Sequence, residues 1–249
     1  MEPDFITLTP ETLPDQHLCC IIRSKKPHPG VEAKRRWLTD RLPEGHMFRK
    51  LDVKEKVFIE YAPLETAWVP VEGDNYLYLY CLWVAGAYKG QGYGRALLES
   101  CLEDARAQGR SGVCMLGAEK QKAWLSDQAF ARKHGFVTAD ETDYGYTLLA
   151  RSLDGTLPRF TDRSRAGTID AKELTVYYSD QCPYMANSLD MIHQVCGELG
   201  VPCSLVKVDT LEQAKSLPCV FNNCAVFYGG AFQTVNLPDA AWLRRLLKR

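Results

Sequence analysis

The sequence of 249 residues predicts an α/β protein built from two domains. Two runs of alternating strand and helix patterns, with a polar and aperiodic stretch between them, lead to this prediction. The first run covers residues 1–152 and the second covers residues 171–249. Residues 153–170, which are punctuated by glycine, proline and arginine, are expected to form the linker between the two domains.

Composition narrows the classes of function. The formal net charge of −1 argues against a broad nucleic-acid-binding surface. No apolar stretch is long enough to span a membrane, and residues 1–20 lack the basic start and apolar run of a signal peptide. Ten scattered cysteines in a chain of this length favour free thiols and a cytoplasmic location. Because no pair of Cys-x-x-Cys units exists, no metal site is expected.

The first domain is expected to alternate strands with helices. Its predicted strands are 5–9, 47–51, 57–61, 67–71, 76–84, 112–117 and 144–150. Its predicted helices are 14–42, interrupted at Pro27–Gly30, then 95–108 and 124–134. Lys34, Arg35 and Arg36 are expected to lie on a solvated face of the first helical region.

A glycine-rich stretch between the predicted strand 76–84 and the predicted helix 95–108 organises this domain. Its glycines, Gly90, Gly92 and Gly94, allow backbone amides to approach a ligand without interference from a Cβ atom. The start of the following helix adds free N–H groups and the positive end of a helix dipole. The stretch therefore predicts an anion site suited to a pyrophosphate. The P-loop ending and the dinucleotide-binding glycine spacing are both absent.

The spacing Lys89-x-x-Gly92-x-Gly94 resembles the Arg/Gln-x-x-Gly-x-Gly/Ala signature of the GNAT superfamily of N-acetyltransferases. Lysine departs from the usual first residue, which matters little where main-chain amides carry the phosphates. The resemblance extends over roughly residues 5–150 and includes the strand end Leu82–Val84 and the pair Gly135-Phe136. It implies the mixed sheet with flanking helices of the GNAT acyl-CoA N-acyltransferase fold, acetyl-CoA as co-substrate and a small amine as acceptor.

The resemblance also implies which residues bind acetyl-CoA. The glycine-rich turn would bind the pyrophosphate, and the end of the preceding strand would pair with the pantetheine arm. One strand amide can also polarise the thioester carbonyl. The residues expected at the coenzyme are Leu82, Trp83, Val84, Lys89, Gly90, Gln91, Gly92, Tyr93, Gly94, Arg95 and Ala96.

Deprotonation of the acceptor amine needs a general base. The resemblance puts Glu60 and Glu65 near the acceptor, and both are equally compatible with plain surface carboxylates. Tyrosines occupy every second position at the start of the predicted strand 76–84, a pattern more typical of side chains packed on one face of a sheet. Weaker candidates for the base are His46, Tyr78, Tyr80 and Cys81.

The proton donor to the leaving thiolate is not where the family usually has it. Many GNAT enzymes carry an Asn and, seven residues later, a Tyr in the helix before Gly-Phe. Trp124 and Ala131 stand at these two positions. Tyr144 or Tyr146 can substitute, and coenzyme A is a fair enough leaving group for a donor to be dispensable.

The second domain has the order strand, helix, strand, helix, two strands and helix. Its predicted strands are 174–178, 204–208 and a hairpin over 224–232, and its predicted helices are 185–199, 211–216 and 238–248. With Cys182-Pro183-Tyr184 at the first strand-to-helix turn, this order resembles the thioredoxin and glutaredoxin architecture. Leu217-Pro218 stands before the third strand, where that fold has a cis-proline.

Cys182 is the candidate reactive residue of the second domain. It is expected at or just before the N-terminus of the helix that follows, with Pro183 in the first helical position. The helix dipole then favours the thiolate. Because Met185 occupies the place of the usual second cysteine, only monothiol chemistry remains, with Cys219 as the one other thiol expected nearby. The alternative is an inert cysteine in a scaffold retained for packing.

A GNAT domain followed by a thioredoxin-like domain with Gln-Cys-Pro-Tyr resembles the YoaP-type acetyltransferases. The prediction is therefore an acetyl-CoA-dependent N-acetyltransferase that acts on a small amine. Two alternatives remain. One is a protein that binds coenzyme A without turnover and senses thiols, which the missing Asn and Tyr favour. The other is a monothiol redox protein, which the missing partner of Cys182 disfavours. The acceptor and the oligomeric state are left open.

Overall fold

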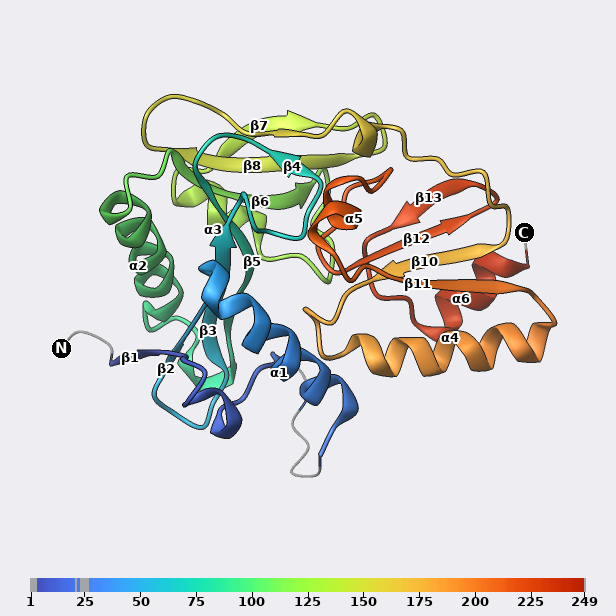
Figure 1. Cartoon of the computed structure of the whole chain (residues 1–249), viewed down its shortest axis with the longest axis horizontal. Helices are drawn as coiled ribbons and strands as arrows, with labels where there is room; N and C mark the ends of the chain where they lie inside the picture. Colours follow the sequence, from blue (N-terminus) through green and yellow to red (C-terminus); the bar gives the residue numbers. More distant parts are fainter. Residues whose placement is uncertain (1–3, 21, 23–26, 249) are drawn as a thin grey trace. The chain divides into compact units, whose positions relative to one another are not determined.

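The computed structural model describes residues 4–20, 22 and 27–248 (Figure 1). The chain divides into two compact units. Unit 1 comprises Met1–Cys20, Leu38–Ala67 and Val71–Phe160. Unit 2 comprises Ile21–Trp37, Trp68–Pro70 and Thr161–Arg249. Unit 2 thus includes an N-terminal stretch as well as the C-terminal part of the chain.

Unit 1 is built around a seven-stranded sheet in the order β1-β2-β3-β5-β6-β8-β7 (Figure 1). Among its described strands only β5 and β6 pair in parallel, so the sheet is mixed. Its strands are β1 (Phe5–Thr7), β2 (Met47–Leu51), β3 (Val57–Pro63), β5 (Tyr76–Val84), β6 (Gly112–Ala118), β7 (Val137–Glu141) and β8 (Tyr146–Ser152). Its helices are α2 (Tyr93–Ala107), α3 (Gln128–Lys133) and the 3-10 helices η1 (Leu13–Asp15), η2 (Leu42–Glu44) and η3 (Gly86–Tyr88). The short strands β4 (Val71–Glu72) and β9 (Arg159–Phe160) form a separate antiparallel pair.

Helix α2 packs on the middle of this sheet because one of its faces is apolar. It contacts β3, β5 and β6. Each fully buried leucine contributes roughly 1.5–3 kcal/mol, so this face anchors the helix firmly. The buried residues of α2 are Leu97, Leu98, Cys101, Leu102 and Ala105.

A bulge in β5 determines which side chains face α2. In the register of β3 with β5, Tyr80 has no partner of its own. Before the bulge the odd-numbered Leu79 belongs to the core under α2, and after it the even-numbered Leu82 and Val84 pack against that core. An extra residue in one strand changes the alternation of side chains in this way.

Strands β5 and β6 separate where the bulge begins. They pair only over Tyr76–Tyr78 and Gly112–Cys114, although β5 continues to Val84 and β6 continues to Ala118. The last part of β5 therefore has one edge paired with β3 and the other edge without a partner strand among the described residues.

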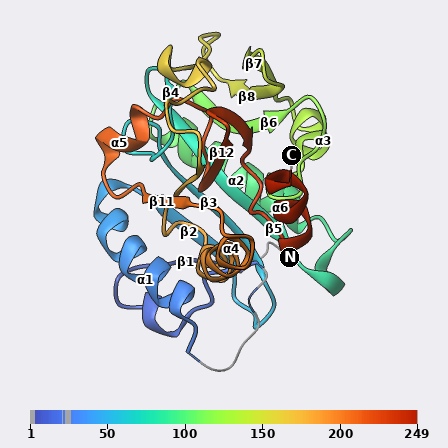
Figure 2. The same ribbon diagram turned by 90° about the vertical axis from the view of Figure 1, so that its right-hand side faces the viewer.

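Unit 2 contains a four-stranded sheet in the order β11-β10-β12-β13, in which β10 and β11 are parallel and the other pairs antiparallel. Helices α4 and α6 pack against each other (Figure 2). The strands are β10 (Leu174–Tyr178), β11 (Cys203–Lys207), β12 (Cys224–Tyr228) and β13 (Ala231–Thr234). The helices are α4 (Met185–Leu199), α5 (Leu211–Lys215), α6 (Ala240–Leu247) and η4 (Arg163–Arg165). Helix α1 (Pro29–Arg41) begins in unit 2 and ends in unit 1.

The order of elements predicted for residues 174–248 agrees with the structure to within two residues at each end. One implied detail is wrong, because the peptide bond before Pro218 is trans, like every described peptide bond. Residues 153–170, expected to form a linker, contain β9 and η4. The boundary between the units in this region falls after Phe160.

Three elements of unit 1 differ from those predicted. The strand predicted over 67–71 begins only at Val71, as β4, because Pro70 has no N–H to donate to a ladder. The helix predicted over 124–134 is only α3, because the Asp127 side chain caps it by accepting the N–H of Phe130. Strand β7 was not predicted, since its sequence is largely polar.

The first helical region is shorter and more buried than predicted. Residues 16–20 and 22 are not helical, and residues 21 and 23–26 of the prediction lie outside the described residues. Lys34 is buried at 2% exposure and is not on a solvated face, because Trp37 and Leu38 follow it by one turn on the same side of α1. Arg36 is exposed as expected.

Candidate functional site

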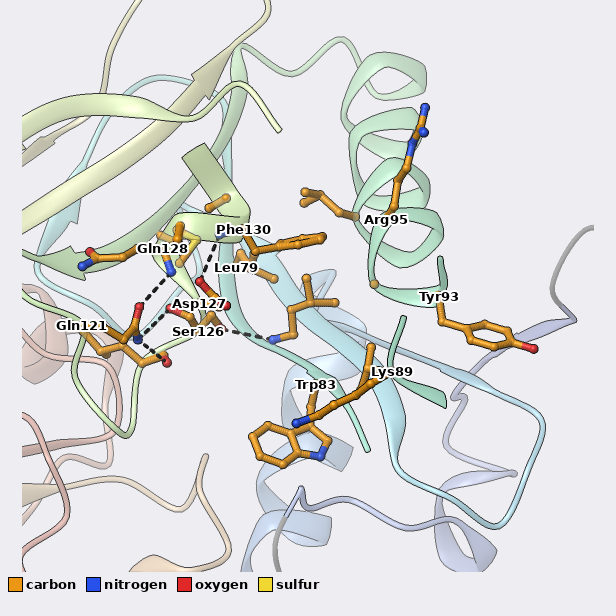
Figure 3. Close-up of a pocket in the computed structure, with 18 of the residues that line it drawn as sticks. Leu79, Trp83, Lys89, Tyr93, Arg95, Gln121, Ser126, Asp127, Gln128 and Phe130 are labelled. Atoms are coloured by element: carbon orange, nitrogen blue, oxygen red, sulfur yellow. Dashed lines mark hydrogen bonds between the residues drawn. The ribbon is translucent and has the colours of Figure 1, made fainter. Parts of the chain in front are cut away.

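The gap between β5 and β6 opens into a cavity of about 920 Å³ in unit 1 (Figure 3). Apolar side chains from the diverging strands, Leu79 and Met115, line it. So do the end of β5, the glycine-rich turn with the start of α2, and the segment 121–131 that leads into α3. The cavity thus has a strand edge on one side and a helix N-terminus at one end.

The glycine-rich turn brings the first amides of α2 to the wall of this cavity. Gly92 is the N-cap of α2 and has a φ of 86°, a left-handed conformation that favours glycine. A Cβ atom at Gly92 would meet nothing within 4 Å, so the space in front of the turn is open. Ala96 is the first residue whose N–H bonds back along the helix, to the Gly92 carbonyl. The N–H groups of Tyr93, Gly94 and Arg95 therefore have no acceptor within the helix.

Positive charge surrounds this turn. Lys89 and Arg95 are exposed residues in the cavity wall, and Figure 3 shows them on the turn and on α2. Lys122, from the opposite segment, also lines the cavity. Unpaired amides with two cations beside them, and a third cation across the cavity, favour an anionic ligand.

The outer edge of β5 offers main-chain groups to the cavity. The N–H of Ala85 donates to the Lys56 carbonyl next to β3, at 3.0 Å. By the alternation of an antiparallel ladder, the main-chain groups of Trp83 point the same way, whereas those of Leu82 and Val84 point to the open edge. Of the three strand residues expected to pair with a ligand, only Leu82 and Val84 offer main-chain groups, and Trp83 offers its partly exposed indole.

Most residues expected at the coenzyme lie around this one cavity. Gln91 and Ala96 do not line it among the described residues, because the Gln91 side chain bonds to the Ala87 carbonyl and the Ala96 amide bonds within α2. Those that do line it are Leu82, Trp83, Val84, Lys89, Gly90, Gly92, Tyr93, Gly94 and Arg95.

The segment between β6 and α3 is held in place by the Gln121 side chain (Figure 3). Its Nε2 donates to the carbonyls of Lys122, Leu125 and Ser126 at 2.9–3.3 Å, and its Oε1 accepts the N–H of Gln128 at 3.0 Å. Two side chains of this segment then satisfy amides on the diverging strands. Gln128 Oε1 accepts the N–H of Ala118 in β6 at 3.1 Å. Ser126 Oγ accepts the N–H of Leu82 in β5 at 3.2 Å.

Glu60 forms a buried pair with His46. Its Oε1 lies 2.9 Å from His46 Nε2, and the two side chains are 1% and 3% exposed. The His46 ring lies against Tyr80, with ring centroids 5.3 Å apart. Glu60 does not line the cavity, but it is opposite Cys81 in the register with β5, one residue from Leu82. A carboxylate that holds an imidazole in this way can tune it as a base.

The other candidates for proton transfer are less well situated. Glu65 is exposed and pairs with Arg110, at 3.0 Å. Tyr144 lies in the turn before β8, with its ring 6.0 Å from that of Tyr146. Burial raises the pKa of Tyr78 well above its usual value, so this phenol remains protonated. None of these residues lines the cavity among the described side chains.

A second cavity, of about 120 Å³, lies beside Cys182 in unit 2. The start of α1 fits closely there, because a Cβ atom at Gly30 would lie 1.8 Å from the Pro183 carbonyl oxygen. His28 Nε2 also lies 2.9 Å from Asn187 Oδ1 on α4. The cavity is lined by Gly30, Ala33, Tyr178, Asp180, Cys182, Met185, Ala186 and Leu189.

Cys182 is half-buried and precedes α4 by one turn. The N–H of Met185 donates to the Cys182 carbonyl at 3.0 Å, which closes a turn ahead of the helix. Pro183 is therefore a turn residue and not the first residue of the helix, a correction that agrees with its fixed φ.

The buried thiols near Cys182 include one that was not expected. Burial, followed by the charge of Cys182, raises the pKa of Cys224, so these two sulfurs are neighbours. Burial also raises the pKa of Cys219, whose second influence is Cys224. Cys219 is thus not the one other thiol close to Cys182. Cys224 begins β12, and its partner Tyr178 in β10 lies four residues before Cys182.

Sequence reasoning missed the third side of the large cavity. Ser126 and Gln128 act through side-chain bonds to the main chain of β5 and β6, outside their own segment, whereas Gln121 bonds only within the segment. The one local signal was Ser126-Asp127, two residues typical of a helix start, which marked the end of the segment but not its contacts.

Two broader features can be stated for the described residues. No helix among them has the length and apolarity needed to cross a bilayer. No group of three or more His, Cys, Asp or Glu side chains among them is arranged to hold a metal ion.

Two family models match parts of the chain. The one described as Acetyltransferase (GNAT) family matches residues 14–136, and the one described as YoaP-like matches residues 202–245. A curated relative from Bacillus subtilis (strain 168), named an uncharacterized N-acetyltransferase YoaP, is 33% identical over 245 residues. That match covers 98% of this chain and 98% of the relative, so it runs through both units.

Solved structures resemble the chain at greater distance. Ard1 from Thermoplasma volcanium is 15% identical, with 61% of this chain and 98% of that chain covered and a TM-score of 0.42. A GNAT family acetyltransferase from Brucella melitensis, in complex with acetyl-CoA, is 15% identical, with 63% and 92% covered and a TM-score of 0.40.

Proposed function

The chain belongs to the GNAT family of N-acetyltransferases, and from this premise we propose that it transfers the acetyl group of acetyl-CoA to a small amine. The observation that carries the proposal is the glycine-rich turn, whose amides face the same cavity as the open edge of β5. Acetyl-CoA is an elongated, anionic thioester. It needs donors for its phosphates at one end and main-chain partners along its arm, and this cavity offers both.

The pyrophosphate binds at the start of α2. The N–H groups of Tyr93, Gly94 and Arg95 donate to its oxygens, and the side chains of Lys89 and Arg95 add positive charge. Hydrogen bonds to a charged acceptor contribute about 1.5–3 kcal/mol each, and three of them account for selection of an anion here.

The thioester end of acetyl-CoA lies along the open edge of β5. Val84 pairs with the pantetheine arm through its main-chain groups, and the Leu82 N–H donates to the thioester carbonyl, whose oxygen gains negative charge as the amine attacks. This step requires Ser126 Oγ to yield the Leu82 N–H, whose hydrogen bond it accepts at 3.2 Å.

The buried pair of Glu60 and His46 supports deprotonation of the acceptor. The pair lies beside the bulge of β5, on the opposite sheet face from the core under α2. Because the side chains of Glu60 and His46 are both buried, the proton reaches this pair through a bound water. Of the two carboxylates considered, Glu60 is favoured over Glu65, whose partner is Arg110 on the surface.

We further propose that unit 2 is a thioredoxin-like domain joined to the acetyltransferase domain by residues 153–170. The strand order β11-β10-β12-β13, with a parallel first pair and a helix after β10, supports this reading. Limited trypsin digestion tests the division: we expect the first cuts after Arg159, Arg163 or Arg165 and a surviving fragment of about the first 152 residues. First cuts elsewhere would count against it.

Two measurements test the proposed activity. Calorimetry should detect acetyl-CoA binding at micromolar to millimolar ligand. A panel of polyamines, aminoglycosides, amino acids and amino sugars, assayed for thiol release from acetyl-CoA, should then identify acceptors. Absence of acetyl-CoA binding at millimolar ligand would refute the proposal.

A further inference from the structure

The hydroxyl of Ser126 lies at the point of the large cavity where the thioester is expected to react. It is hydrogen-bonded to the Leu82 N–H at 3.2 Å, on the open edge of β5 (Figure 3). In the proposed function that N–H donates to the thioester carbonyl oxygen. The carbonyl oxygen and the sulfur of a thioester are bonded to the same carbon, so the partners of these two atoms must be neighbours. Ser126 is such a neighbour.

The position of this hydroxyl is well fixed. Gln121 Nε2 donates to the Ser126 carbonyl at 3.3 Å, and the next residue, Asp127, caps α3 by accepting the N–H of Phe130 at 3.0 Å. Leu82 is itself part of β5. A donor held on both sides by folded elements loses little entropy when it binds a ligand.

Few side chains in the described wall of the cavity carry a hydroxyl that can donate to the sulfur. The hydroxyl-bearing residues in the described wall are Tyr88, Tyr93 and Ser126. The two tyrosines pair with each other beside the glycine-rich turn, with ring centroids 5.6 Å apart, at the phosphate end. Of the two positions where the family usually has its Asn and Tyr, Ala131 has no donor and Trp124 does not line the cavity.

We propose that Ser126 donates a hydrogen bond to the sulfur of coenzyme A and so stabilises the leaving thiolate; this rests on the proposed acetyl transfer. The amine nitrogen forms a bond to the acetyl carbon, and the carbon–sulfur bond then breaks with its electron pair going to sulfur. The amine proton leaves through the Glu60 and His46 pair or water. Ser126 keeps its own proton throughout, because an alcohol is a weaker acid than a thiol, and the free thiolate is later protonated by solvent.

The test uses coenzyme A and desulfo-coenzyme A, which differ only at the sulfur, and needs no knowledge of the acceptor. Their affinities are measured by calorimetry between pH 7 and 9.5 on the whole protein. A hydrogen bond to the thiolate lowers the pKa of the bound thiol. A decrease of about one pKa unit means that the ratio of the two affinities rises in favour of coenzyme A across this range, several-fold by pH 9.5 and at most about tenfold at higher pH. We expect this rise in the native protein and in Ser126→Thr, and its loss in Ser126→Ala.

Further measurements separate this role from a structural one. With an acceptor from the panel, Ser126→Ala should lower kcat about tenfold while KM for acetyl-CoA changes less than about twofold. Ser100→Ala is the matched control, because Ser100 is a half-buried serine of α2 that bonds the Leu97 carbonyl outside the cavity. It should leave the affinity ratio and kcat unchanged.

Two results would overturn the role of Ser126 while leaving acetyl transfer intact. One is an unchanged pH dependence of the affinity ratio in Ser126→Ala. The other is tighter acetyl-CoA binding and faster turnover in that variant, which would mean that Ser126 only occupies the Leu82 N–H. If neither coenzyme A nor desulfo-coenzyme A binds the native protein, the proposed function fails, and the role of Ser126 with it.

Discussion

Two cavities among the described residues, one in each unit, differ in what lines them. The cavity of unit 1 measures about 920 Å³ and offers main-chain donors from a strand edge and a helix start, with lysine and arginine beside them. The cavity of unit 2 measures about 120 Å³ and is lined by small and apolar side chains, one tyrosine, one carboxylate and one thiol. Backbone donors recognise a shape and a charge, whereas a thiol offers reactivity. The difference indicates that unit 1 is built to hold a large anionic ligand and unit 2 to admit only a small group.

The largest effect that we expect is a loss of folding stability at acid pH, which concerns unit 1 and not unit 2. Burial, reinforced by the charges of Lys50 and Lys56, lowers the pKa of His17 in unit 1 to about 4. Since the unfolded chain has a His pKa near 6.5, unit 1 binds fewer protons when folded, and its stability is lost as the pH falls from about 6.5 to about 4. The loss should approach 3 kcal/mol, from about 1.4 kcal/mol for each pKa unit.

Urea unfolding at pH 7, 5 and 4 measures this effect. His17→Phe, which keeps a ring against Phe58, should flatten the dependence on pH. His193→Phe in unit 2, where the side chain is exposed, should leave it unchanged. Equal pH dependence in the native protein and in His17→Phe would show that the acid sensitivity arises elsewhere.

The next effect concerns chemistry in unit 1. Glu60→Gln should lower turnover about a hundredfold or more if the pair with His46 supports the base, because the amide cannot hold a positive imidazole. Acetyl-CoA affinity should remain within about twofold, since Glu60 does not line the cavity. Glu65→Gln is the control, and its turnover should stay near that of the native protein. Unchanged turnover in both variants, with a competent acceptor, would remove both carboxylates from the mechanism.

A smaller effect probes the phosphate end of the same cavity. Gly92→Ala puts a Cβ in the open space before the α2 amides at a φ of 86°, so the turn must either distort or crowd the ligand. Loss of one hydrogen bond to a phosphate weakens acetyl-CoA binding about tenfold or more. Gly109→Ala has a similar φ of 63° with nothing within 4 Å, and Gly109 does not line the cavity. Both variants should lose stability, but only Gly92→Ala should lose affinity in calorimetry.

The parts of the large cavity differ in how far they could be predicted from the sequence. The glycine-rich turn, β5 and α2 are contiguous in the chain, so local patterns were sufficient for that wall of the cavity. Trp83 was assigned a main-chain role because the bulge at Tyr80, and hence the alternation after it, depends on pairing with β3. Ser126 was missed because its bond to Leu82 joins residues 44 positions apart.

In unit 2 the pattern of elements was predictable, but the surroundings of Cys182 were not. Helices α4 and α6 and the strand order follow from local periodicity and short connections. The lining of the small cavity by Gly30 and Ala33 does not, since those residues precede Cys182 by about 150 positions. Lys34 was misjudged for a similar reason: charge in a helix says little about which face is buried by partners distant in sequence.

The smallest effect that we expect concerns the thiol of unit 2. Cys182 is half-buried, lies one turn ahead of α4 and borders a cavity, so it should react with a small alkylating reagent faster than the other nine cysteines. Cys203 is the matched control, because it is also half-buried and in unit 2 but lies in β11. We expect a ratio of labelling rates of about tenfold or less, since the small cavity restricts access while the helix start favours the thiolate only modestly.

Mass spectrometry after timed alkylation at pH 6.5 measures this ratio for each cysteine. Gly30→Ala sharpens the result, because its Cβ would clash with the Pro183 carbonyl and force the start of α1 away from the turn. If α1 limits access, Gly30→Ala should accelerate labelling at Cys182 while Cys203 stays at its native rate. If Cys182 is instead protected in the native protein until denaturant is added, the thiol is structural. The cavity of unit 2 is then a gap in the packing beside an unreactive thiol, and only the cavity of unit 1 is a site for a ligand.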